Sequence, residues 1–283
     1  MDRHSELRGF LRSRRARLRP EDVGLPLFDE RRRVPGLRRE ELARLAGVSI
    51  SHYTRLEQGQ HTHVSASVLD SVASALRLHG EEHEYLHNLV KAPRPTPGPT
   101  PARTLRNLRY LVDSVTGVPA YVTGRYGDAL AWNRMTALTF FDFDAVPPAQ
   151  RTWTHAIFLD SLLRTRLTDA GQWDQAARCQ AGYLRLCWSR FPNDPDIAAA
   201  ITELLRISDD FRRLWDEHLI HNWPHKQVRI RHELGGTLEL ELEVLRPDGA
   251  PDLAVASFAA APHSPAEAGL ARIAGAHRTA VSP

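Results

Sequence analysis

The sequence predicts an α+β protein of two domains: an all-helical N-terminal domain over residues 1–91, and a C-terminal domain over residues 104–275 in which helices cover a sheet. Three observations predict this division. In the first part, apolar residues recur at helical spacing. Residues 92–103 then contain five prolines, a composition typical of a semi-rigid, extended linker. After the linker, apolar residues alternate strictly with glutamate from Leu238 to Val244, as in a strand with one buried face.

The most informative stretch of the N-terminal domain covers residues 37–59, which read as a helix, a tight turn and a second helix. Gly47 stands where the turn needs a residue that accepts positive φ. Ser49 is a natural N-cap for the second helix, and Ala43 is small enough for two helices to cross closely. These features predict a helix-turn-helix, a motif that places its second helix in the major groove of DNA. The alternative is an αα-hairpin inside an ordinary helical bundle.

One side of the second helix is expected to pack on the core through Val48, Tyr53 and Leu56, which leaves the other side facing DNA. Arg55 is the best candidate for a bidentate contact to guanine, and Ile50 can meet a thymine methyl group. Arg39, at the start of the first motif helix, is expected to contact a phosphate. The predicted DNA-binding residues are Arg39, Ser49, Ile50, Ser51, His52, Thr54 and Arg55.

Three further helices, at about 5–17, 65–78 and 80–90, complete the five expected in this domain. Positive charge gathers here, because residues 1–60 hold 14 Lys and Arg against 9 Asp and Glu, a net charge of +5. This excess suits a surface that binds phosphate. Several other residues of this domain either contact DNA phosphate or are simply solvated, and the sequence leaves both possibilities open. They are Arg12, Arg14, Arg15, Arg17, the run at 31–33 and the loop at 60–64.

His79, His83 and His87 follow one another at i, i+4 and i+8, a spacing that can form a metal-binding helix face. The intervening HGEEH is not an HExxH motif, and no carboxylate or thiol with ligand spacing stands nearby in the sequence. We therefore expect a solvated helix face, no metal and no catalytic cofactor.

The C-terminal domain begins with a helix at about 104–116, followed by two short strands and a helix that carries Met135, Leu138 and Phe141. A helical middle and three late strands come next, so the sheet is expected to be half covered by helices. Residues 266–283 are expected to be frayed, with a tail over 276–283. The middle helices are expected at about 152–168, 172–190, 194–206 and 209–220, and the strands at about 118–122, 128–133, 228–232, 238–244 and 253–258.

The motif residues resemble the Xre family of phage-repressor-like helix-turn-helix domains. The chain is similar to the MmyB-like transcription regulators of actinobacteria in two segments, RRRVPGLRREELARLAGVSISHYTRLEQGQ and the following SASVLDSVASALRL. The resemblance continues over about residues 103–275, through GVPAYVTGRYGDALAWN, the FRRLWDEH segment and the late strands. It implies a PAS-like C-terminal domain that binds a lipid-like or fatty-acid-like molecule.

Dense aromatic residues in this domain suit an apolar ligand, although most buried aromatic side chains simply form core. A carboxylate head group would need a cation at the mouth of the pocket, for which Arg109, Arg178 and Arg185 are candidates. The predicted pocket residues are Tyr121, Trp132, Phe141, Phe158, Tyr183, Trp188 and Arg178.

Other functional classes find little support. The chain has no nucleophile elbow, GxGxxG or phosphate loop, and we interpret His218 and His221, with Asp216 and Glu217, as a helix cap or interface rather than an acid–base group.

No apolar run approaches the roughly 20 residues of a membrane span. The N-terminus MDRHSELRGF lacks an apolar signal core, so a cytoplasmic protein is expected. Cys179 and Cys187 are expected to be buried thiols.

The sequence therefore predicts a sequence-specific DNA-binding transcriptional regulator controlled by a small apolar ligand. One such motif reads only a short half-site, so a homodimer on an inverted-repeat operator is expected. The alternative is a DNA-binding regulator whose C-terminal domain serves only dimerisation or docking of a protein partner.

Overall fold

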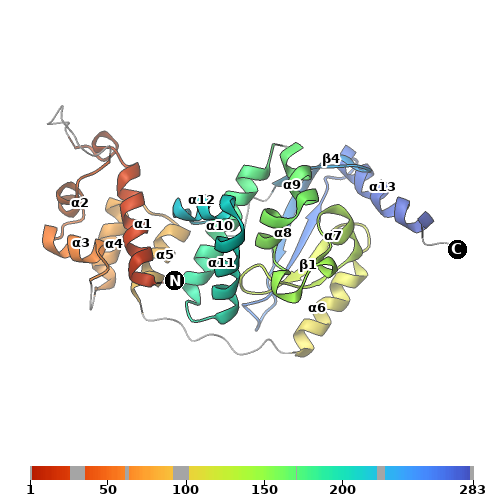
Figure 1. The fold of residues 1–283 in the computed structure, drawn as a ribbon, viewed down its shortest axis with the longest axis horizontal. Coiled ribbons are helices and arrows are strands. Elements are labelled where there is room, and N and C mark those ends of the chain that lie inside the picture. Colours follow the sequence, from red (N-terminus) through yellow and green to blue (C-terminus); the bar gives the residue numbers. More distant parts are fainter. Residues whose placement is uncertain are drawn as a thin grey trace.

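The computed structural model describes residues 2–25, 36–60, 64–91, 102–169, 171–221 and 227–280, the last four without their side chains. Figure 1 shows the first five helices grouped at one end of the molecule and the sheet toward the other, with α10, α11 and α12 between them. The basic run at 31–33, the loop at 61–63, most of the predicted linker and residues 281–283 lie outside the described residues.

Within its described residues, the N-terminal domain contains five α-helices and one 3₁₀ turn, which confirms the all-helical prediction. Its core combines Leu7, Phe10 and Leu11 of α1 with Leu42 of α2 and Tyr53 of α3, all fully buried. The elements are α1 (Arg3–Arg17), η1 (Pro20–Val23), α2 (Arg39–Leu45), α3 (Ile50–Glu57), α4 (Ala66–Ala75) and α5 (Glu81–Val90).

In the C-terminal domain, one helix and two strands come first, a helical middle follows and three strands come late, as predicted. The helices and 3₁₀ turns are α6 (Ala102–Ser114), α7 (Arg134–Thr139), η2 (Phe143–Ala145), η3 (Pro148–Gln150), α8 (Trp153–Leu159), α9 (Ser161–Asp169), α10 (Trp173–Arg190), α11 (Pro195–Ile207), α12 (Asp209–Asp216) and α13 (Pro265–Ala280). The strands are β1 (Ala120–Thr123), β2 (Ala129–Trp132), β3 (Gln227–His232), β4 (Gly236–Leu245) and β5 (Ala254–Ala259).

The five strands form one antiparallel sheet in the order β2-β1-β5-β4-β3. Tyr121 pairs with Ala256, and Leu242 pairs with Phe258, so their side chains share one face of the sheet. That face packs against the helices of the middle segment, while α6 covers Ala120 and Val122 on the other. An antiparallel sheet half covered by helices confirms the predicted α+β class with a PAS-like second domain.

The single helix predicted at about 152–168 is wrong, because the chain turns at Asp160 and forms two helices. Asp160 has extended backbone angles. Its carboxylate accepts a hydrogen bond from the Leu163 amide at 2.6 Å, which caps the start of α9. An aspartate that competes for backbone donors explains the break inside an otherwise helical apolar pattern.

The prediction of a frayed C-terminus is also wrong for most of the segment, since α13 packs on the sheet. Its residues Ala266, Leu270 and Ile273 are at most 4% exposed. A Cβ atom on Gly269 would lie 2.5 Å from the Gly235 carbonyl oxygen, so the helix approaches the β3–β4 turn more closely than a larger residue allows. Among the described side chains, just two large apolar residues, Leu270 and Ile273, anchor this alanine-rich helix, so its sequence pattern is weak.

Leu270→Ala should destabilise the protein by about 2–5 kcal/mol, because it leaves a cavity between α13 and the sheet. The measurement is the free energy of unfolding in urea. Ala268→Ser, on the exposed side of the same helix, should change it by less than about 0.5 kcal/mol. Equal effects of the two substitutions would mean that α13 contributes no packing.

Candidate nucleic-acid interface and ligand cavity

The turn between α2 and α3 has the predicted geometry. Gly47 adopts a φ of 66°, and the amide of Val48 donates to the Ala43 carbonyl at 3.0 Å. Ser49 caps α3, since its hydroxyl accepts a hydrogen bond from the His52 amide at 3.2 Å. Ala43 is fully buried at the helix crossing. The motif is therefore a helix-turn-helix whose second helix is α3.

The two sides of α3 differ in exposure as the sequence predicts. Tyr53 and Leu56 are buried, whereas Ser49, Ser51 and Arg55 are exposed and His52 and Thr54 are partly exposed. Ile50 is 55% exposed among these polar neighbours. In Figure 1, α2 and α3 lie on the side of the N-terminal helices that faces away from α10. This exposed side is thus open to a macromolecule.

A buried carboxylate fixes α3 from behind. Glu57, at the end of α3, is fully buried and receives two hydrogen bonds at 3.1 Å from Arg15 and two at 3.0–3.1 Å from Arg39. Burial raises the pKa of Glu57, but the hydrogen bonds from Arg15 and Arg39 outweigh it, so this pKa lies below its ordinary value. Glu57 is therefore a charged anchor that joins α1, α2 and α3.

This anchor changes the interpretation of Arg39. The side chain remains 45% exposed, but its guanidinium is already paired with Glu57. Arg39 positions α3 through Glu57, and its contact with a DNA phosphate stays a prediction. The signal that could have revealed this role is an acidic residue on the inner side of α3, where an apolar one is the usual choice.

The expectation that the arginines of α1 are solvent-side cations is wrong for two of the four. Arg15 pairs with Glu57, and Arg14 is only 3% exposed. Arg14 lies over the Phe10 ring, pairs with Glu82 at 2.7 Å and donates to the His218 carbonyl at 2.8 Å. Burial lowers the pKa of Arg14 to about 10, against the opposing effect of Glu82. Arg12 and Arg17 are exposed.

The contact from Arg14 to His218 belongs to an interface between the two domains. At its centre, Glu6 of α1 pairs with Arg185 of α10, whose side chain is 1% exposed. The Tyr85 hydroxyl donates to Glu6 at 3.2 Å, and His218 Nδ1 lies 3.6 Å from the same carboxylate. Nearby, Arg190 pairs with Glu84 at 2.9 Å. Helices α1 and α5 thus dock on α10.

Burial and charge pairing have opposite effects on the pKa of Glu6. Burial raises its pKa, but the neighbouring His218 and the charge of Arg185 together lower it below the ordinary value. Arg185 is therefore part of the domain interface and does not stand at a pocket mouth, which corrects that candidate role. The interpretation of His218 as an interface residue is confirmed.

An apolar cavity of about 70 Å³ lies between the sheet and the helices α8, α9 and α10. Ten of its eleven lining residues are hydrophobic, and Gln180 is the polar exception. Such a lining suits an apolar ligand. The lining residues are Tyr121, Phe140, Trp153, Ile157, Leu163, Leu167, Ala176, Gln180, Val228, Leu242 and Phe258.

Of the seven residues predicted for the pocket, Tyr121 lines this cavity and the other six do not. The aromatic members of that group pack elsewhere: Trp132 and Phe141 contact Phe143, and Phe158 contacts Trp173 and Phe211. Tyr183 and Trp188 are buried within α10. Arg178 forms surface ion pairs with Asp174 and Glu217, and Arg109 donates to the Leu130 carbonyl.

Sequence reasoning missed most of the lining because it chose residues for aromatic character. Leu242 and Phe258 stand on the apolar face of alternating strands, and that alternation could have identified them. The helical contributors, such as Ala176, carry no comparable signal.

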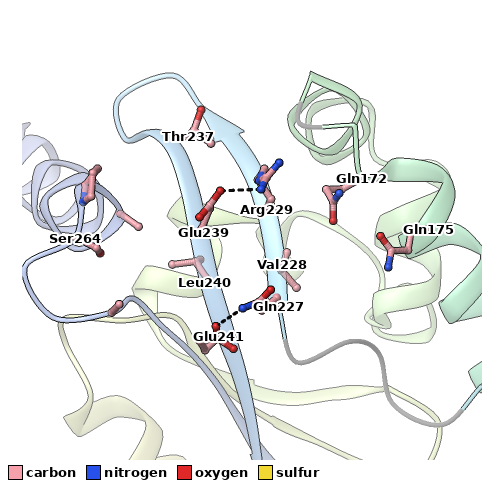
Figure 2. A pocket seen from close by; sticks show the side chains of 13 residues that line it. Gln172, Gln175, Gln227, Val228, Arg229, Thr237, Glu239, Leu240, Glu241 and Ser264 are labelled. Carbon is pink, nitrogen blue, oxygen red and sulfur yellow. Dashed lines mark hydrogen bonds and ion pairs between the residues drawn. The ribbon is translucent and has the colours of Figure 1, made fainter.

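A larger, polar hollow of about 630 Å³ borders this cavity at the β3 edge of the sheet (Figure 2). Gln172 and Gln175 stand on one side of it, and the cross-strand pair of Arg229 with Glu239, 2.8 Å apart, on the other. Val228 lines both the hollow and the apolar cavity. The hollow therefore lies directly outside the cavity.

Comparison with known families agrees with this two-part organisation. Residues 6–86 match a helix-turn-helix domain, and residues 106–273 match the ligand-binding domain of MmyB-like transcription regulators. The chain belongs to the MmyB-like transcription regulators. Among curated proteins, none matched it. Both matched domains are regulatory, so this MmyB-like regulator combines DNA binding with a ligand-binding domain.

Two further observations bear on this MmyB-like regulator. In the part of the chain that the structure describes, no helix combines the length and apolarity needed to cross a membrane. Cys179 and Cys187 are both buried, as predicted.

For the DNA interface, Arg55→Ala should cost about 1–3 kcal/mol of binding free energy on the cognate operator and relax the preference for one base. Arg55→Lys keeps the charge but loses the bidentate fork, so it should relax the preference almost as much. Binding to an array of operator variants measures both effects. A loss that is uniform over all DNA would assign Arg55 to a phosphate.

For the domain interface, Glu6→Gln should destabilise the protein by about 3–5 kcal/mol, because it leaves Arg185 buried without its counter-charge. Glu84→Gln, in the more exposed pair with Arg190, should cost at most about 1 kcal/mol. Urea unfolding distinguishes the two, and equal costs would show that burial of Arg185 does not matter.

The same contact predicts a pH dependence. Because the folded pKa of Glu6 is lowered, its contribution to stability is complete above the ordinary value of 4.5 and is lost as pH falls through the folded pKa. The stability difference between wild type and Glu6→Gln should therefore shrink in acid. A difference that stays constant down to acid unfolding would contradict the charge pairing.

Proposed function

We propose that this MmyB-like regulator binds operator DNA through the exposed side of α3 and that a small apolar, fatty-acid-like ligand in the cavity controls its affinity. The observation that carries the proposal is the path of α10. Ala176 and Gln180 of α10 line the cavity, and Arg185, Ser189 and Arg190 of the same helix contact the N-terminal domain. One continuous helix therefore touches both the ligand cavity and the DNA-binding domain.

The size of the cavity indicates how a ligand would act. At about 70 Å³ it is far smaller than the roughly 300–1,000 Å³ of sites that hold drug-sized ligands. A long acyl chain must therefore displace lining side chains to enter. The cavity at this volume is too small for such a chain, so ligand binding should favour a wider separation of α10 from the sheet.

The polar hollow offers a route of entry. β3 is the edge strand of the sheet, and Val228 on this strand separates the hollow from the cavity. An edge strand is paired on one side only, so it can move outward with fewer broken hydrogen bonds than an inner strand. Arg229 at the rim is 51% exposed and can meet a carboxylate head group once it releases Glu239.

DNA recognition follows from the exposed residues of α3. Arg55 supplies the bidentate donor for guanine, Ile50 an apolar contact for a thymine methyl group, and the serines hydrogen bonds to base edges or phosphate. One α3 covers a short half-site, so we propose a homodimer that reads an inverted repeat.

Titration with long-chain fatty acids should change operator affinity with a coupling of about 1–3 kcal/mol, or about 5–150-fold in dissociation constant. Fluorescence anisotropy of labelled operator DNA, with the protein titrated at fixed fatty acid, measures this coupling. Ala176→Leu, which fills the cavity from α10, should reduce fatty-acid binding and coupling while leaving affinity for DNA unchanged.

Ala198→Leu on α11 is the matched control, because Ala198 is also half-buried but does not line the cavity. It should retain both fatty-acid binding and coupling. No change in operator affinity across a broad panel of apolar ligands would favour the second candidate, a C-terminal domain that serves only assembly or partner docking. Equal effects of the two leucine substitutions would place the ligand elsewhere.

A further inference from the structure

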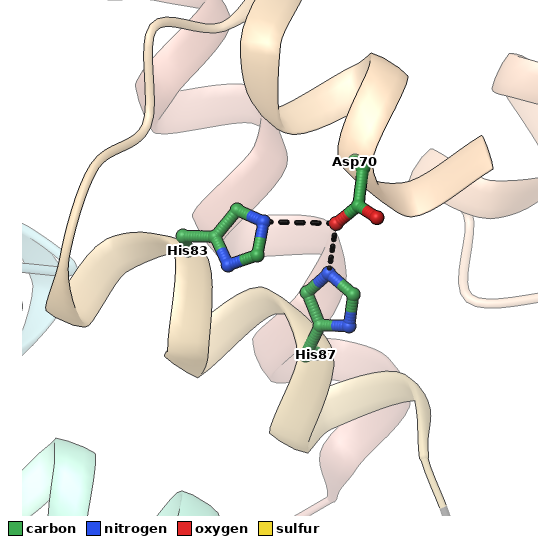
Figure 3. A group of neighbouring side chains, drawn as sticks. All are labelled: Asp70, His83 and His87. Atoms are coloured by element: carbon green, nitrogen blue, oxygen red, sulfur yellow. Dashed lines mark hydrogen bonds and ion pairs between the residues drawn. The ribbon is translucent and has the colours of Figure 1, made fainter. Parts of the chain in front are cut away.

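A cluster of three side chains outside both functional regions joins α4 to α5. His83 and His87 stand one turn apart on α5, and Asp70 extends toward them from α4 (Figure 3). Each imidazole Nε2 lies 2.9 Å from the same Asp70 oxygen. The two rings stack with centroids 4.5 Å apart. Three potential metal donors therefore converge on one point.

The sequence spacing of the histidines indicated a metal face, but the lack of a nearby carboxylate argued against it. The structure corrects that argument, because the crossing of α4 and α5 brings Asp70 to His83 and His87. His79, the third histidine of the pattern, is exposed and is not part of the cluster. The ligand set is thus His83, His87 and Asp70, from two helices.

The geometry suits a small transition-metal ion. The three donor atoms all lie within 4.8 Å of one another. Tetrahedral zinc, with bonds of about 2.0–2.1 Å, needs donors about 3.3 Å apart. The nitrogen–oxygen distances of 2.9 Å need to open by only a few tenths of an ångström, which rotation of the exposed Asp70 side chain can provide.

Exposure leaves room for further ligands. The side chains of Asp70 and His83 are 55% and 42% exposed, whereas that of His87 is 10% exposed. Water can therefore complete the coordination from the solvent side. The other ring nitrogen of His87, Nδ1, is buried and has no hydrogen-bond partner among the described residues. In most metal sites this second ring nitrogen donates a hydrogen bond that holds the imidazole in place. Without that bond, the site should bind its ion less tightly than a permanent structural zinc site does.

We propose that Asp70, His83 and His87 form an exchangeable binding site for a divalent transition-metal ion of the zinc class. Two imidazoles with one carboxylate favour such ions over Mg²⁺ and Ca²⁺, which take oxygen ligands. The ion links α4 to α5. Because Glu84 and Asn88 of α5 contact α10, the site also lies on the helix that docks the two domains.

The test uses full-length protein without a histidine tag and titrates ZnSO₄ in a calorimeter, with thermal unfolding measured in parallel. Asp70→Asn and His83→Gln each remove one ligand from an exposed position, so neither disturbs the core. His79→Gln is the matched control, since it removes a neighbouring exposed histidine outside the cluster.

We expect wild type and His79→Gln to bind one Zn²⁺ per chain and to unfold several degrees higher when zinc is present. Asp70→Asn and His83→Gln should bind at least about tenfold more weakly and lose that thermal shift. Co²⁺ in place of zinc should give d–d absorption stronger than that of aqueous Co²⁺ in wild type and the control, and not in the two ligand variants. The proposal is overturned if no protein binds one equivalent, or if all four bind zinc equally.

Discussion

The pairing of Glu6 with Arg185 determines how the two domains of this regulator are placed. Both side chains are withdrawn from water, so either charge alone would be strongly unfavourable. Tyr85 donates to the same carboxylate, and Arg185 donates to the Trp215 carbonyl and stacks on its ring. These contacts satisfy both charges only when α1 and α5 lie against α10. The position of the DNA-binding domain is therefore fixed relative to the ligand-binding domain.

A second buried carboxylate, Glu57, fixes α3 within the DNA-binding domain by the same chemistry. Glu57 pairs with Arg15 and Arg39, and Arg14 pairs with Glu82 beside the domain interface, although a count of charges would assign all three arginines to DNA. The net positive charge of the N-terminal third therefore overstates the positive charge that faces DNA. In the proposed function, specific recognition depends instead on Arg55 and on the exposed polar side of α3.

The sequence predicts features that depend on neighbouring residues and fails where distant segments meet. Gly47, Ser49 and the alternation from Leu238 to Val244 act locally, so the motif and the sheet could be predicted. Aromatic character indicates that a side chain is buried, but it does not indicate which cavity the ring lines. Of the seven predicted pocket residues, Tyr121 therefore is the one that lines the apolar cavity. The approach of Asp70 to two histidines arises from a helix crossing, and no spacing along the chain encodes it.

In the proposed mechanism, the buried charges also decide what kind of response a ligand can produce. A ligand shifts an equilibrium only by its difference in affinity between two states. Widening the closed cavity moves α10, and α10 carries Arg185 at the domain interface. Arg185 cannot leave Glu6 gradually, because a half-broken pair loses its attraction while both charges remain buried. Movement of α10 therefore either carries the whole N-terminal domain with it or separates the interface, so operator affinity changes between two discrete arrangements.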